Sequence, residues 1–216
     1  MKHLSRYCLV MLALLVGLTS MSARAAGESP EAVVRSSVDA LMSKLENRQD
    51  YYRQHEDELK STVKQTIDPI VDWNYITASV MGKYFRAASP EQRSRFAGVF
   101  KQTLLDTYAK GLVTFDYQTV RVLDDQSAQR YEDQANVQME VVANDGQTYP
   151  VSYTLKQRNG DWKVVNVVVN GINLGLTFRN QFDQAMRDNN RDIDRVISSW
   201  APDVDLQKSG QDGQAQ

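Results

Sequence analysis

The sequence predicts an α+β protein in which an antiparallel four-stranded sheet packs against a set of helices. Three observations lead to this prediction. Apolar residues recur at helical spacing from about residue 30 to about residue 112, the period changes to two from about 117 to 170, and helical spacing returns after Gly171. Two turn signals, Asn144-Asp145-Gly146 and Asn159-Gly160, divide the middle part into hairpins. Helices grouped around an antiparallel sheet form an α+β domain.

The first 25 residues have the parts of a secretory signal peptide. Lys2 and Arg6 make the front basic, residues 8–18 are an uninterrupted apolar run, and Ala23-Arg24-Ala25 supplies the small residues of a cleavage site. The run is shorter than the roughly 20 residues that span a bilayer. We therefore expect a cleaved signal over 1–25 and a mature chain that begins at Ala26. A membrane anchor that is kept is the alternative.

Cleavage would leave a mildly acidic chain without cysteine. It would remove three basic residues and no acidic one, which changes the formal net charge at pH 7 from −2 to −5. Nucleic-acid binding needs a basic surface, so this charge argues against it. The one cysteine, Cys8, lies in the signal, so the mature chain would have no disulfide and no thiol site.

The first predicted helix follows Ser29-Pro30, where the serine hydroxyl can cap the helix and proline fits its first turn. Its apolar positions are Val33, Val34, Val38, Leu41, Met42 and Leu45. The polar stretch 47–60 predicts a turn and a second helix. Asp68-Pro69 predicts the start of another helix. One side of that helix carries Ile70, Trp73, Thr77, Val80, Met81 and Tyr84.

The clearest helix start is Ser89-Pro90, because Gln92 can reach back and complete a capping box. Side chains four residues apart lie on one face of a helix. The helix after Pro90 therefore has a long aromatic and aliphatic stripe, which consists of Phe96, Phe100, Leu104, Tyr108 and Leu112. Gly111 is a natural end for it.

Four strands are predicted, over about residues 117–123, 134–142, 147–157 and 161–170, and an antiparallel meander is their simplest arrangement. Alternation places Val137, Met139 and Val141 on one face of their strand, and Tyr149, Val151, Tyr153 and Leu155 on one face of the next. In the last strand, alternation separates Val164 and Val168 from Val165, Val167 and Val169.

After Gly171 the helical period returns. The apolar positions of this part are Leu174, Phe178, Phe182, Met186, Ile193, Val196, Ile197 and Trp200. Residues 202–216 are polar and rich in glycine and glutamine, which predicts a disordered tail. No linker or repeat divides the chain, so we expect one domain over 26–201.

The residues of the common catalytic sites are missing from the sequence. The mature chain has one histidine, His55, and Leu59 stands where a zinc-hydrolase helix would need a second one. A serine nucleophile needs a neighbouring base, and there is no G-x-S-x-G elbow. The acids of 188–192 lack the glycine and the glutamate of a calcium loop. We expect neither an enzyme nor a metal site.

The valine-rich strand 162–169 has two interpretations. It is either a central strand that is covered on both faces and needs no ligand, or one of its faces lines a cavity that aromatic side chains and methionines close. Residue pattern alone leaves both open.

Two blocks of the sequence resemble the MlaC family, also called toluene-tolerance proteins of the Ttg2 type. The first contains Val80-Met81-Gly82-Lys83-Tyr84-Phe85, then Ala88-Ser89-Pro90-Glu91-Gln92, then Phe96-x-x-x-Phe100. The second contains Trp162-Lys163-Val164, the valine-rich strand, Gly171-Ile172-x-Leu174 and Phe178-Arg179-x-x-Phe182. Their order spans nearly the whole mature chain. Asn166 and Asn170 stand where the family leads us to expect acids, and Asn173 where it leads us to expect a serine.

The resemblance implies a periplasmic phospholipid carrier. Proteins of this family shelter acyl chains in an apolar cavity between sheet and helices. They shuttle lipid between an inner-membrane ABC transporter complex that carries MCE domains and an outer-membrane lipoprotein–porin complex, which maintains outer-membrane lipid asymmetry. Phospholipid would be bound as cargo, and no cofactor is implied.

The predicted cavity lining combines the helix stripe, the end of the preceding helix and the inner strand faces. Its members are Met81, Tyr84, Phe96, Phe100, Leu104, Tyr108, Val137, Met139, Val141, Val151, Tyr153, Leu155 and Val164. Lys83 and Arg86 are predicted at the mouth, near the headgroup phosphate. Two other functions stay open: a periplasmic adaptor or chaperone that binds only proteins and has a filled core, and a hydrolase that acts on lipids or envelope polymers.

Overall fold

The structure, a computed structural model, describes residues 28–124, 131–202 and 204. The predicted signal peptide and almost all of the predicted tail lie outside these residues. The helices before the sheet are α2 (Pro30–Leu45), α3 (Gln49–Gln54), α4 (Glu56–Ile67), α5 (Trp73–Met81), the 3-10 turn η1 (Gly82–Tyr84), α6 (Pro90–Tyr108) and α7 (Gly111–Thr114). The helices after it are α8 (Leu174–Asp188) and α9 (Ile193–Ser198).

Both serine–proline helix starts are confirmed. The Ser29 hydroxyl accepts a hydrogen bond from the amide of Ala32, and α2 begins at Pro30. At the start of α6 the Ser89 hydroxyl accepts from the amide of Gln92, and the Gln92 side chain accepts from the amide of Ser89. Gly111 does not end that helix, because α6 stops at Tyr108 and Gly111 begins the short α7.

The predicted helix start at Asp68-Pro69 is wrong. Asp68 is the C-cap of α4, and α5 begins at Trp73, where the Asp72 carboxylate accepts from the amide of Tyr75. The residues between pair with the sheet instead, since Val71 forms a parallel bridge with Val164. The carbonyl of Ile70 accepts from the amide of Val164 at 2.7 Å. Pairing with a strand edge has overridden a local helix signal.

The predicted antiparallel meander is confirmed. Its strands β1 (Tyr117–Val122), β2 (Gln134–Ala143), β3 (Thr148–Arg158) and β4 (Asp161–Val169) lie next to one another in sequence order. The sheet has a fifth strand that was not predicted, the two-residue β5 (Ile172–Asn173), which pairs with the end of β4. Between β4 and β5, Asn170 and Gly171 both have positive φ, of 50° and 83°. Such values characterise the tightest hairpin turns, and asparagine–glycine is their usual sequence.

A β-bulge in β4 makes the predicted side-chain alternation of that strand wrong. Leu155 of β3 pairs with Val164, whereas Thr154 pairs with Asn166, so Val165 is an extra residue in β4. An extra residue shifts the side chains beyond it to the other face. Val164 therefore shares a face with Val167 and Val169, which pair with Tyr153 and Val151, and not with Val168.

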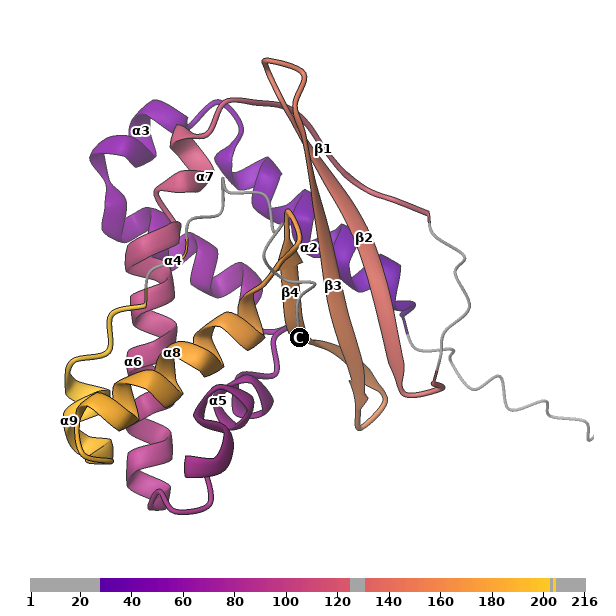
Figure 1. The fold of residues 1–216 in the computed structure, drawn as a ribbon. Helices are drawn as coiled ribbons and strands as arrows, with labels where there is room; N and C mark the ends of the chain where they lie inside the picture. Colours follow the sequence, from indigo (N-terminus) through magenta and orange to yellow (C-terminus); the bar gives the residue numbers. More distant parts are fainter. Residues whose placement is uncertain (1–27, 125–130, 203, 205–216) are drawn as a thin grey trace, which may run out of the picture.

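The helices meet the sheet in two places, across one face at β1 and β2 and along β4 (Figure 1). Helix α2 crosses one face of the sheet and packs on β1 and β2. Helices α5, α6, α8 and α9 pack on one another, and α5 and α8 also contact β4. Most buried apolar residues of the described chain fall into three clusters: one between α2 and the sheet, one among α5, α6, α8 and α9, and one among α2, α3, α4, α6 and α7.

Candidate functional site

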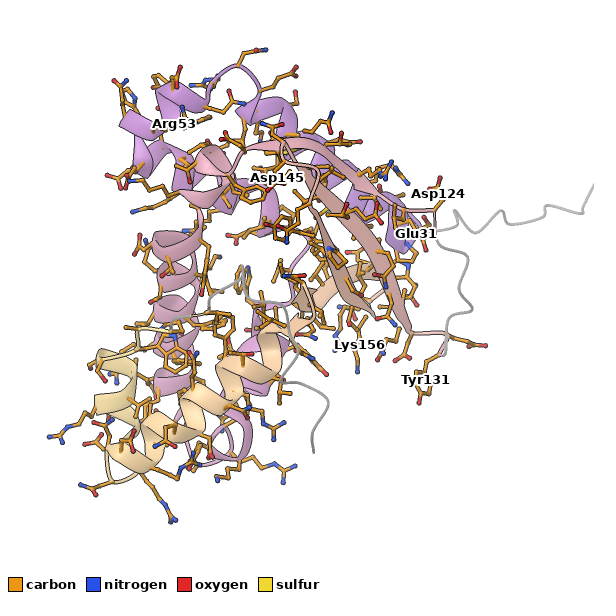
Figure 2. The ribbon with its side chains drawn as sticks, turned by 45° about the horizontal axis from the view of Figure 1, so that its top comes forward. Glu31, Arg53, Asp124, Tyr131, Asp145 and Lys156 are labelled. Carbon is orange, nitrogen blue, oxygen red and sulfur yellow. The ribbon has the colours of Figure 1, made fainter. Side chains whose placement is uncertain are left out.

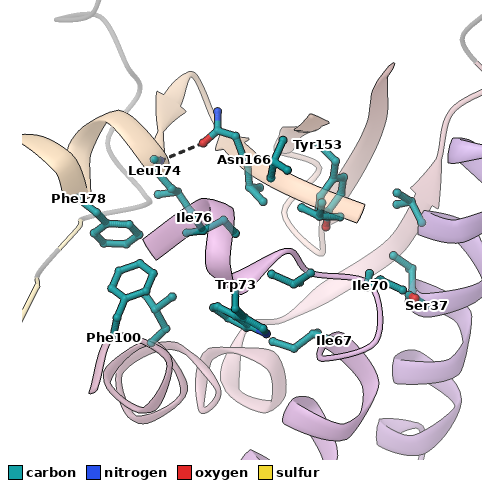
Figure 3. A pocket seen from close by; sticks show the side chains of 18 of the residues that line it. Ser37, Ile67, Ile70, Trp73, Ile76, Phe100, Tyr153, Asn166, Leu174 and Phe178 are labelled. Carbon is teal, nitrogen blue, oxygen red and sulfur yellow. Dashed lines mark hydrogen bonds between the residues drawn. The ribbon is translucent and has the colours of Figure 1, made fainter. Parts of the chain in front are cut away.

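An apolar cavity of about 270 Å³ lies where the three hydrophobic clusters meet (Figure 3). Its walls come from α2, the end of α4, the segment before α5, α5 itself, α6, β3, β4 and the start of α8. Val38, Leu104 and Leu41 belong to three different clusters, and all three side chains line it. The three clusters therefore surround a cavity, and the fold prediction included such a cavity between sheet and helices.

The lining is almost entirely hydrocarbon. It consists of Val34, Ser37, Val38, Leu41, Ile67, Ile70, Val71, Trp73, Ile76, Phe100, Leu104, Tyr153, Val164, Val165, Asn166, Val167, Leu174, Gly175 and Phe178. Within the part of the chain that the structure describes, no charged side chain contributes to it. Such a wall suits an acyl chain, which offers no hydrogen-bonding group, and it has no side chain that would act as a general base.

Tyr153 places a hydroxyl group at this wall, and that hydroxyl group stays protonated and uncharged. The hydroxyl lies 3.9 Å from the sulfur of Met139, which is a weak acceptor. Burial raises the pKa of Tyr153 to about 12, because the phenolate would lose its hydration. The side chain therefore remains uncharged at physiological pH and adds an aromatic surface to the cavity.

One polar contact joins the sheet to α8 at the cavity wall. The Asn166 side-chain oxygen accepts from the amide of Gly175 at 3.0 Å (Figure 3). In the next residue of the helix, the amide of Leu176 donates to the Asn173 side-chain oxygen at 3.1 Å, which caps α8. These two asparagines, which replace residue types expected from the family, thus both have local structural roles.

Four of the thirteen predicted lining residues lie at this cavity: Phe100, Leu104, Tyr153 and Val164. Two groups lie elsewhere. Met81, Tyr84, Phe96 and Tyr108 belong to the cluster of α5, α6, α8 and α9 or pack against it. Val137, Met139, Val141, Val151 and Leu155 belong to the cluster between α2 and the sheet or pack against it. Their contact with a lipid stays a prediction.

Most of the cavity wall was missed from sequence. Val34, Val38 and Leu41 of α2 were recognised as an apolar helix face, and so were Trp73, Leu174 and Phe178, but nothing in their spacing distinguishes a cavity from a filled core. Ile67 reaches the cavity at the end of α4, and Ile70 and Val71 reach it because the chain leaves the helical path after α4 and pairs with β4. Only knowledge of that pairing would have identified Ile70 and Val71.

The two cations predicted at the mouth do not line the apolar cavity. Lys83 donates to the Asp183 carboxylate at 2.8 Å, and this hydrogen bond raises the pKa of Lys83. The same bond is the largest of the effects that hold the pKa of Asp183 at about 2. Arg86 is exposed, and its carbonyl accepts from Arg93. A role for Lys83 and Arg86 in headgroup binding stays a prediction.

His55 lies on the surface between α3 and α4, where its ring stacks on Tyr51 with centroids 4.0 Å apart. In the described residues, no three His, Cys, Asp or Glu side chains gather as metal ligands would. No helix of this part combines the length and the apolar character that crossing a bilayer requires.

Comparison with known proteins identifies the family. Residues 35–202 match the family model described as MlaC protein. The chain is 37% identical to the toluene tolerance protein ttg2D of Pseudomonas putida, over 97% of this chain and 94% of that protein. It is 26% identical to the intermembrane phospholipid transport system binding protein MlaC of Haemophilus influenzae, over 76% of each.

A solved structure has the same fold. It is the phospholipid-binding protein from Ralstonia solanacearum in complex with a phospholipid, and it matches with a TM-score of 0.69 at 25% identity, over 80% of this chain and 98% of that one. The element order, the cavity between sheet and helices and these matches agree with the resemblance found in the sequence, and the chain belongs to the MlaC family.

Proposed function

We propose that this protein is a periplasmic carrier of phospholipid. It holds acyl chains in the apolar cavity and shuttles lipid between the inner and outer membranes, which maintains outer-membrane lipid asymmetry. The observation that carries the proposal is the uncharged cavity between sheet and helices, in a fold shared with a protein solved in complex with a phospholipid. By family resemblance, its partners are an inner-membrane ABC transporter complex with MCE domains and an outer-membrane lipoprotein–porin complex.

The energetics of lipid transfer explain why a cavity without catalytic groups is enough. Two chains of about 16 carbons exposed to water cost roughly 25 kcal/mol, at about 0.8 kcal/mol per methylene. A barrier of that height permits escape from a membrane on the order of once in days. A hydrocarbon wall removes this cost without making or breaking a bond. The carrier's affinity for lipid must be close to that of the membrane, because much tighter binding would prevent release of the lipid.

The cavity must widen to take a whole diacyl lipid. Its volume of about 270 Å³ lies below the roughly 300–1,000 Å³ of pockets for drug-sized ligands, and two acyl chains are larger than such ligands. We propose that the chains first contact Phe100, Leu104, Tyr153 and Val164, the four predicted residues that already line the cavity.

The direct test is organic extraction of the purified mature protein, followed by mass spectrometry. Co-purified phospholipid in a fixed ratio to protein supports a carrier. Protein that folds and yields no phospholipid, even after incubation with vesicles, would instead indicate an adaptor or chaperone with a filled core.

A matched pair of variants tests whether this cavity is the site. Val167 lines the cavity, whereas its neighbour Val168 does not, and both are half-buried residues of β4. Val167→Trp places an indole in the cavity and should lower the lipid-to-protein ratio strongly. Val168→Trp makes the same chemical change on the other face and should leave the ratio unchanged. Equal ratios in the two variants would contradict this location.

A further inference from the structure

A second pocket, of about 280 Å³, adjoins the apolar cavity and has a different chemistry. Ile76, Val165, Asn166 and Gly175 line both spaces. A hydrocarbon-lined cavity and a polar pocket therefore adjoin at α5, the β4 bulge and the first turn of α8. A lipid has the same division, because its acyl chains are joined to a polar headgroup.

The polar pocket carries positive charge. Lys156, from the end of β3, and Arg179, from α8, both line it, and no acidic residue of the described chain does. In the described chain neither cation forms an ion pair, unlike Lys83 with Asp183. Figure 2 shows Lys156 at the same end of the sheet as Tyr131. The Lys156 ammonium lies 5.1 Å from the centre of the Tyr75 ring, an attraction that leaves its hydrogen-bond donors available.

Two asparagines turn further donors toward this region. Asn166 and Asn173, which both line the pocket, use their side-chain oxygens to accept from the amides of Gly175 and Leu176. Their amino groups are therefore the parts that remain for a ligand, and amino groups only donate. The dipole of the 15-residue helix α8 adds a partial positive charge at the same end.

We propose that this pocket binds the phosphate of a phospholipid whose acyl chains occupy the apolar cavity, with Lys156 and Arg179 as its cationic ligands. The proposal rests on the proposed function and specifies its cargo. A lining with two cations and no carboxylate matches a headgroup with net negative charge, such as phosphoglycerol. It offers no carboxylate to the ammonium of phosphoethanolamine, so the protein favours anionic phospholipid.

The test uses delipidated mature protein and displacement of a fluorescent-acyl phosphatidylglycerol by unlabelled phosphatidylglycerol or phosphatidylethanolamine. Removing charge-assisted hydrogen bonds in Lys156→Gln/Arg179→Gln should weaken phosphatidylglycerol binding by about tenfold or more, with a much smaller effect on phosphatidylethanolamine. The matched control is Lys64→Gln/Arg195→Gln, which removes the same charge at exposed positions that line neither space and should change neither affinity.

Asn166→Asp is a second variant that does not depend on removing a large side chain. Aspartate has the same shape and can still accept from the amide of Gly175, but it places a negative charge on the pocket wall. It should keep the unfolding midpoint and weaken phosphatidylglycerol binding selectively. Equal weakening of both lipids, or a selective effect of the control pair instead, would overturn the assignment.

Two further results separate the sources of failure. Calorimetry can show that inorganic phosphate binds the wild type and not the Lys156→Gln/Arg179→Gln variant. If the two proteins then have the same affinity for each lipid, the pocket holds free phosphate and the headgroup assignment is wrong. If the wild type binds neither lipid, the carrier function itself fails. If it binds both without preference and the variants change nothing, only the headgroup site fails.

Discussion

The contact between Asn166 and Gly175 predicts that Gly175→Ala has opposite effects on stability in two proteins. It should destabilise the wild type, and it should be neutral or stabilising when Asn166 has been replaced by alanine. Alanine is better than glycine in a helix by up to about 1 kcal/mol, and Gly175 lies in the first turn of α8. A Cβ atom at Gly175, however, would stand less than 3.0 Å from the side-chain oxygen of Asn166 and 3.3 Å from its Cγ. Gly175→Ala therefore forces the asparagine to move.

The expected cost follows from what the asparagine loses. Its oxygen accepts from the amide of Gly175 at 3.0 Å in a partly buried position, and one such bond contributes about 1 kcal/mol. Overpacking adds about 1–3 kcal/mol when the neighbour cannot relax fully. Gly175→Ala should thus lower the free energy of unfolding by about 1–3 kcal/mol. After Asn166→Ala the added methyl has space, and the same change should be neutral or raise that free energy by up to about 1 kcal/mol.

A double-mutant cycle measures this coupling directly. Urea unfolding of the four proteins can be followed by the fluorescence of Trp73, Trp162 and Trp200, with equal slopes required for a valid comparison. We expect a coupling energy of at least about 1 kcal/mol. If Gly175→Ala has the same effect in both backgrounds, Asn166 does not limit the space at α8, and the description of this wall is incorrect.

Two further predictions concern other parts of the fold. Ser89→Ala removes one bond of the capping box of α6 and should cost about 1 kcal/mol in urea unfolding; an unchanged midpoint would mean that α6 does not depend on this cap. The pKa of Asp183 is held at about 2, below its ordinary 3.8, first by the hydrogen bond from Lys83. Such a carboxylate stabilises the folded state above its ordinary pKa and loses this contribution as pH falls toward the lower one. Asp183→Asn should therefore flatten the decline of the urea midpoint between about pH 4 and about pH 2, and an unchanged decline would contradict that linkage.

The sequence was informative where local rules decide the structure. Ser29 and Ser89 start helices through bonds to residues three positions away, and asparagine–glycine and asparagine–aspartate–glycine signals divide the meander as predicted. The order of elements was therefore accessible without a structure. Residues 69–71 were predicted wrongly because their partner, Val164, is more than ninety positions away, and no local pattern contains such a contact.

The same limit explains why few of the predicted lining residues lie at the cavity. Val137, Met139 and Leu155 alternate as an inner face should, but α2 covers that face and fills the space. Phe96 lies on the same stripe of α6 as Phe100, yet it is enclosed by Phe182 and Trp200, with ring centroids 4.8 and 5.3 Å away. Periodicity identifies which side chains are buried. It does not distinguish those that pack against other side chains from those that line a cavity.

Non-local features of β4 create the cavity itself. The bulge at Val165 brings Val164 and Val167 to one face, and the pairing of Val71 with Val164 holds the segment before α5 against the strand edge. The Asn166 bond to Gly175 fixes the start of α8 on the other side. Helices held to β4 by hydrogen bonds do not need to fill the space beside it in order to stay in place. A hydrocarbon-lined hollow can therefore persist there, and the wall that it shares with the cationic pocket lies at the same bulge.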